Sequence, residues 1–167
     1  WVSRTPVPIR QRVVDPVADT FDDVSPGAIV PNWNIYSPRL AAVSVVTFPS
    51  QSDHSLELRD REPYDYAKAE RVFPESSRVT AEFAVGAHHA GAGQLQFEIV
   101  DQAGALAVRL VFDKAGAIKV KGAGQLRSVG SYRRSTWTNV KVAVDTSVHR
   151  FSLEIDGQLV VNGGALA

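Results

Sequence analysis

Apolar side chains recur at every second residue in short segments along most of this 167-residue chain. Residues 78–85, for example, place Val79, Ala81, Phe83 and Val85 at alternate positions. Successive side chains of a β-strand point to opposite faces, so a period of two is typical of strands with one buried face. The 24 valines favour the same interpretation, because β-branched residues pack well on a pleated sheet.

Ten such segments are predicted as strands, and turn-forming residues separate them. Asp-Gly at 156–157, and the stretches 101–104 and 113–116 that run from Asp to Gly, are typical of hairpin turns. So many short antiparallel strands predict an all-β fold, either a two-sheet sandwich or a barrel. The predicted strands are 43–48, 55–59, 66–73, 78–85, 94–100, 106–112, 118–120, 138–145, 148–155 and 158–161.

The first 38 residues lack this alternation. Pro6, Pro8 and Pro16 disfavour both helix and central strand over residues 1–19. We therefore expect an extended arm or interdomain linker over 1–19 and one β-sandwich domain over 20–167. The chain begins with Trp1 rather than Met, so we also expect a processed chain or one segment of a larger protein.

The composition excludes several kinds of function. The absence of cysteine excludes disulfides, thiolate zinc sites and cysteine catalysis. Lys and Arg together number 18, as do Asp and Glu, so no bulk electrostatic attraction to nucleic acid or to an anionic membrane is expected. No apolar run approaches the roughly 20 residues that a membrane-spanning helix needs.

Two sets of residues are candidates for sugar binding. Tyr64, Tyr66 and Tyr132 lie close to predicted loops, where an exposed ring offers a stacking surface. Outward-facing polar side chains on the strands form a row that can hydrogen-bond a sugar or a uronate, or else form ordinary cross-strand ion pairs. We take Glu98 and Arg109 from this row as further glycan-binding candidates. The whole row comprises Glu82, Gln96, Glu98, Arg109, Lys119 and Lys121.

Four stretches resemble the concanavalin A-like (laminin-G and glucanase) β-sandwich superfamily, in the form found as accessory domains of secreted bacterial polysaccharide-degrading enzymes. They cover most of residues 20–161 and imply an antiparallel, jelly-roll-like β-sandwich. The stretches are TFDDVSPGAIVPNWNI (20–35), YAKAERVFP (66–74) with VTAEFAV (79–85), LQFEIVDQAGALAVRLVFDKAGAIKV (95–120) and STWTNVKVAVDTSVHRFSLEIDGQLV (135–160).

The resemblance implies a non-catalytic accessory domain that is secreted or periplasmic. Such a domain packs on a catalytic domain or a second chain of the same protein and binds polysaccharide weakly, if at all. The alternative is a polysaccharide lyase or glycoside hydrolase of the same superfamily that uses the polar face from Glu82 to Lys121. The carboxylate motif of the glucanases is incomplete at Glu154 and Asp156, so no catalytic residue is assigned.

The superfamily also implies a structural calcium ion, although no cofactor is required. Asp22 and Asp23 near the start of the sandwich and Asp145 at the end of a strand are the candidate ligands, since calcium prefers oxygen ligands. The other interpretation is that these three residues form turns.

Overall fold

Every regular element in the described part of the chain is a β-strand. The computed structural model describes residues 17–61, 64–88 and 93–167. These residues contain no helix, and therefore none that could cross a membrane. The chain divides after Glu75 into two compact units, the second being Ser76–Ala167. Most of the arm predicted over 1–19 lies outside the described residues, so that boundary stays a prediction.

The first unit contains two antiparallel pairs of strands. One pair joins β1 (Trp33–Tyr36) to β4 (Lys68–Arg71), and the other joins β2 (Ala41–Thr47) to β3 (His54–Asp60). Among the residues of this unit, Ala41 and Val45 on β2 are almost completely buried.

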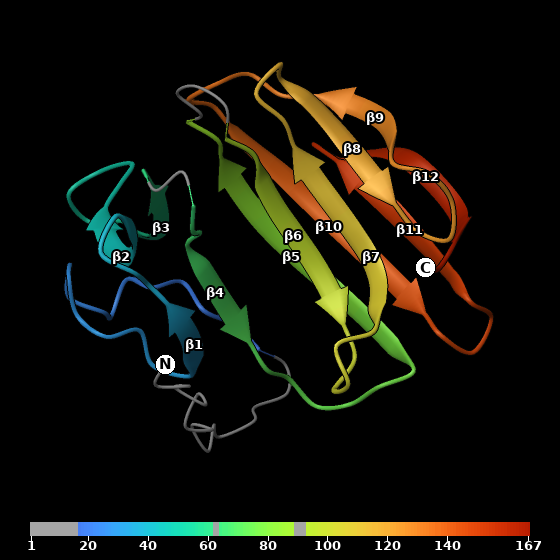
Figure 1. Cartoon of the computed structure of the whole chain (residues 1–167), viewed down its shortest axis with the longest axis horizontal. Coiled ribbons are helices and arrows are strands. Elements are labelled where there is room, and N and C mark those ends of the chain that lie inside the picture. Colours follow the sequence, from blue (N-terminus) through green and yellow to red (C-terminus); the bar gives the residue numbers. More distant parts are fainter. Residues whose placement is uncertain (1–16, 62–63, 89–92) are drawn as a thin grey trace. The chain divides into compact units, whose positions relative to one another are not determined.

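The second unit is a sandwich of two four-stranded antiparallel sheets, and one sheet lies over the other in Figure 1. The first sheet has the order β12-β11-β10-β5 and the second the order β6-β7-β8-β9. The strands of the first sheet are β5 (Arg78–Gly86), β10 (Trp137–Asp145), β11 (Arg150–Ile155) and β12 (Gln158–Ala165). Those of the second are β6 (Leu95–Val100), β7 (Leu106–Phe112), β8 (Ala117–Lys121) and β9 (Arg127–Ser131).

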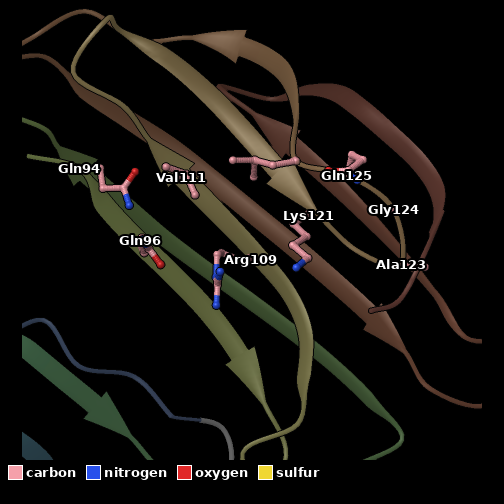
Figure 2. A pocket seen from close by; sticks show the side chains of 9 residues that line it. Gln94, Gln96, Arg109, Val111, Lys121, Ala123, Gly124 and Gln125 are labelled. Atoms are coloured by element: carbon pink, nitrogen blue, oxygen red, sulfur yellow. The ribbon is translucent and has the colours of Figure 1, made fainter.

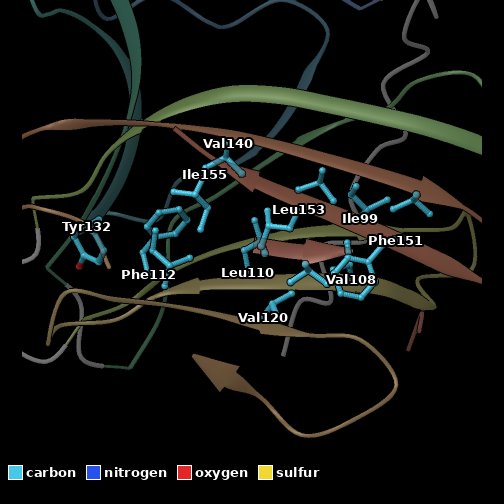
Figure 3. Packing of buried hydrophobic residues seen from close by; sticks show 14 of the residues in the cluster. Ile99, Val108, Leu110, Phe112, Val120, Tyr132, Val140, Phe151, Leu153 and Ile155 are labelled. Carbon is cyan, nitrogen blue, oxygen red and sulfur yellow. The ribbon is translucent and has the colours of Figure 1, made fainter. Parts of the chain in front are cut away.

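The alternating apolar residues of both sheets form one core (Figure 3). Leu110 and Phe112 from β7 meet Val142 and Leu153 from β10 and β11, and all four side chains are fully buried. The all-β antiparallel sandwich predicted from the period of two is therefore confirmed. Assignment to the concanavalin A-like superfamily, with jelly-roll connectivity, stays a prediction.

All ten predicted strands are present, and two further strands were not expected. Strand β1 is short and follows Pro31 and Asn32, which are typical of a turn. Strand β9 is mostly polar, and its pairing with β8 is irregular. The strand predicted over 148–155 begins only at Arg150. His149 has a φ of 52° in the turn before β11, and its side chain is exposed.

The two hairpin turns on either side of β7 share the sequence pattern Asp-x-Ala-Gly-Ala, at 101–105 and 113–117. In each turn the Asp carboxylate accepts hydrogen bonds from the N–H groups of the third and fifth residues, at 2.8 to 2.9 Å. The glycine follows with φ of 83° at Gly104 and 87° at Gly116, a left-handed conformation that glycine adopts without strain. The sequence therefore determines both turns locally.

Asp113 makes one further interaction that Asp101 lacks among the described residues. Its Oδ2 lies 2.7 Å from the Nζ of Lys119. The hydrogen bond from Lys119, together with those from the turn N–H groups, holds the pKa of the Asp113 carboxyl below its ordinary value of 3.8.

We expect the core to respond strongly to truncation. Leu153→Ala removes a fully buried side chain from β11 and should lower the free energy of unfolding by about 2–5 kcal/mol. Leu159→Ala is the matched control on β12, because Leu159 is 51% exposed; its effect should stay within about 0.5 kcal/mol. Urea denaturation measures both, and equal losses in the two variants would contradict the assignment of the core.

The Asp113–Lys119 pair should make stability depend on pH. The folded-state pKa of Asp113 is lowered. The charged carboxylate therefore stabilises the fold at pH values above the ordinary pKa of 3.8. This contribution disappears as the pH falls through the folded-state pKa. Asp113→Asn keeps the turn geometry and removes the charge, so it should destabilise the protein at neutral pH, and this deficit should shrink as the pH falls through the folded-state pKa of Asp113.

Asp101→Asn is the matched control, since Asp101 occupies the same turn pattern but forms no ion pair in the described part of the chain. Chemical denaturation of both variants across this pH range provides the test. A deficit for Asp113→Asn that is the same at neutral and acid pH would rule out the ion pair as its cause.

Candidate functional site

Two exposed tyrosines lie against each other in the first unit. Tyr36 ends β1 and Tyr66 precedes β4; their ring centroids are 5.3 Å apart and the rings are tilted by 45°. Tyr36 is 46% exposed and Tyr66 58% exposed. Asp65 is bonded to both residues: its Oδ2 accepts a 2.9 Å hydrogen bond from the Tyr36 hydroxyl, and its Oδ1 accepts one of 2.9 Å from the backbone N–H of Tyr66. We call Tyr36, Asp65 and Tyr66 the aromatic platform.

The hydrogen bond to Asp65, followed by partial burial, raises the pKa of Tyr36. The phenol therefore stays protonated and continues to donate to Asp65 at neutral pH. Asp65 is left with lone pairs on both oxygens that other donors can use, since a carboxylate has about four acceptor sites.

The β1–β4 pair that carries the platform is fixed at its other end by Asp19. The Oδ2 of Asp19 accepts hydrogen bonds from the Nε1 of Trp33 at 3.1 Å and from the Nε of Arg71 at 2.8 Å. Trp33 and Arg71 are themselves cross-strand partners, and the Arg71 side chain is only 10% exposed. One carboxylate thus ties both strands together.

The three tyrosines predicted to bind glycan lie in different environments. Tyr66 belongs to the platform, and Tyr64 is 93% exposed. The prediction for Tyr132 is wrong: it is 8% exposed, packs edge-on against Phe112 at 5.5 Å, and its hydroxyl donates to the carbonyl oxygen of Asp113. Its ring is part of the core (Figure 3) and offers no face to a sugar.

A shallow groove of about 530 Å³ lies on the outer face of the β6–β9 sheet (Figure 2). We call it the outer groove. It is lined by Gln94, Gln96, Arg109, Val111, Lys121 and residues 123–126. Arg109 and Lys121 alternate with the buried residues of β7 and β8, so the same period that builds the core places these two side chains on the outer face.

The wall of the outer groove formed by residues 123–126 is fixed by Gly122. A Cβ on Gly122 would lie 2.1 Å from the carbonyl oxygen of Ala165, so only glycine allows β12 to come this close. The N–H of Ala123 then donates to the same oxygen at 3.1 Å.

Glu98 and Arg109 are brought together as a cross-strand ion pair between β6 and β7. The expectation that Glu82 joins this row is wrong, because Glu82 lies on β5 in the opposite sheet. There it accepts from the Nζ of Lys141 at 2.9 Å, which raises the pKa of Lys141. The polar face from Glu82 to Lys121, on which the alternative enzymatic function depended, is therefore not one surface.

Asp156 and Gly157 form the predicted two-residue hairpin between β11 and β12, with φ of 49° and 77°. The Asp156 carboxylate accepts from the N–H of Asn139 at 2.8 Å. The residue is thus a turn former that ties the hairpin to β10.

The predicted calcium ligands lie in different units and have local partners. Asp22 accepts from the N–H of His54 at 2.9 Å, and Asp145 accepts from the Nε of Arg78 at 2.7 Å and from Ser147. The hydrogen bonds from Ser147, and then the one from Arg78, lower the pKa of Asp145. Among the residues that the structure describes, no three His, Cys, Asp or Glu side chains gather around a possible metal, and the calcium ion, with Asp23 as its third ligand, stays a prediction.

Comparison with known proteins identifies the family. A solved structure of a sialidase matches with a TM-score of 0.81 and 28% sequence identity, over 90% of this chain and 13% of the sialidase chain. This protein therefore spans about an eighth of the length of that enzyme. No curated protein matches. The family model described as "Sialidase-like, CBM domain", where CBM denotes a carbohydrate-binding module, matches residues 33–165. The chain accordingly belongs to the sialidase-like CBM domain family.

Proposed function

We propose that this protein is a non-catalytic carbohydrate-binding module, and that the aromatic platform is where it holds a sugar. The observation that carries this proposal is the exposed Tyr36–Tyr66 pair, with the Asp65 carboxylate hydrogen-bonded to both residues. Two large exposed rings in contact leave apolar surface in water that a ligand can cover.

The platform suits the surface of a pyranose. One face of such a ring carries mainly C–H groups, which pack against an aromatic ring, while the hydroxyls at its edge need acceptors and donors. Asp65 supplies acceptors beside the rings, and the Tyr36 hydroxyl fixes the direction of the carboxylate. Because the site is open and small, we expect a dissociation constant of roughly 0.1–1 mM, which corresponds to about 4–5.5 kcal/mol.

Weak binding of this kind is useful when the module is attached to an enzyme. Tethering converts a second binding event into an intramolecular one, so a millimolar affinity raises the local concentration of substrate around a catalytic domain. The match to 13% of a sialidase supports a larger, carbohydrate-active parent protein that is secreted or periplasmic. A catalytic domain of the same protein is the partner in this proposal.

The platform is tested by titrating a panel of neutral oligosaccharides into the full chain and into single variants. Tyr36→Ala and Tyr66→Ala should each weaken binding about tenfold, equal to ~1.4 kcal/mol, because each removes one stacking face. Phe73→Ala is the matched control, since Phe73 is a partly exposed aromatic of the same unit that makes no contact with the platform rings in the described contacts.

Circular dichroism of each variant confirms that the sheets remain intact. If every oligosaccharide binds the two tyrosine variants as tightly as it binds the unaltered chain, the platform is not the site. Tyr64→Ala shows in the same experiment whether the neighbouring exposed tyrosine contributes.

A further inference from the structure

Two cations face each other across β7 and β8. Arg109 and Lys121 are cross-strand partners, and both side chains line the outer groove (Figure 2). Like charges directly opposite each other in a sheet are destabilising. Glu98 on β6, the other neighbour of β7, forms an ion pair with Arg109. Lys121 makes no ion pair with any described residue. The groove therefore holds one positive charge that no carboxylate in the described part of the chain balances.

The neighbouring Lys119 shows that this arrangement is not general to β8. Lys119 lies two residues before Lys121 and pairs with Asp113 at 2.7 Å. It does not line the outer groove. Of these two lysines on the same strand, only the one inside the groove is without a partner among the described residues.

The rest of the lining fits a sugar that carries an acid group. Gln94, Gln96 and Gln125 offer amides, each with donors and an acceptor, which match hydroxyl groups that also donate and accept. Leu126, which is 42% exposed, adds apolar surface. The volume of about 530 Å³ lies within the range of small-molecule sites.

The charge balance favours one carboxylate over a polyanion. Nucleic acids are held by several cations along the backbone, whereas the groove has a single excess charge and the chain as a whole has none. A carboxylate between Lys121 and Arg109 would accept charge-assisted hydrogen bonds and relieve their mutual repulsion.

We infer that the outer groove is a second sugar-binding site, separate from the aromatic platform, and that it binds the carboxylate of an acidic saccharide through Lys121 and Arg109. This inference rests on one part of the proposed function, namely that the protein binds glycan. Two kinds of sugar carry this chemistry, a sialic acid and a uronic acid, and the probes below distinguish them.

The test uses the full chain and three probes: sialyllactose, lactose as its neutral core, and a tetrasaccharide that contains glucuronic acid. At least one acidic probe should bind about tenfold more tightly than lactose at low salt. This difference should shrink as sodium chloride is added, since salt screens exposed charges. The probe that shows the difference identifies the acid.

Lys121→Gln removes the charge and keeps an amide in the groove. It should weaken the acidic probe about tenfold and change lactose binding less than twofold. Lys119→Gln is the matched control on the same strand and should leave the affinity for the acidic probe unchanged. NMR titration adds a readout of position: the acidic probe should shift the amide signals of β7 and β8.

Three outcomes separate this inference from the proposed function. If the acidic probes bind no better than lactose, or if Lys119→Gln weakens them as much as Lys121→Gln, the inference is overturned while the platform stands. If the acidic probe depends on Lys121 but no ligand responds to Tyr36→Ala or Tyr66→Ala, the groove stands and the platform fails. If none of the three probes binds at all, the inference that the outer groove binds an acidic saccharide is overturned.

Discussion

The apolar layer between the two four-stranded sheets is the interaction on which the second unit depends. Leu110, Phe112 and Leu153 are fully buried there, and the cost of exposing such side chains fixes which face of each strand points inward. Because strand side chains alternate, the same constraint determines the outer face. Arg109 and Lys121 lie on the outer face because the residues next to them in the sequence are buried in the core.

The sequence allowed the strands and several turns to be predicted because their signals are local. Alternation over six to nine residues marked β5, β6, β7 and β10, and Asp-Gly at 156–157 marked a hairpin that needs two residues with positive φ. The ion pair of Glu98 with Arg109 was one of two interpretations left open, and the register of β6 against β7 confirms that the pair forms.

Features that depend on which strands are neighbours could not be predicted. Glu82 has the same outward phase as Glu98, but β5 pairs with β10 and so belongs to the opposite sheet. Tyr132 follows a polar strand and looks like a loop residue, yet it completes the core beside Phe112. The partnership of Tyr36 with Tyr66 requires the β1–β4 pairing, and β1 carried no clear alternation.

The close approach at Gly122 gives the outer groove a property that its lining alone does not. Residues 123–126 form one wall of the groove, but the hydrogen bond that positions them ends on Ala165, in a strand of the opposite sheet. The shape of the groove is therefore a long-range property of the folded sandwich, absent from any partly folded state in which the sheets have separated. A ligand that requires this shape binds only the folded protein, and by mass action it stabilises the contact between the sheets as well as its own site.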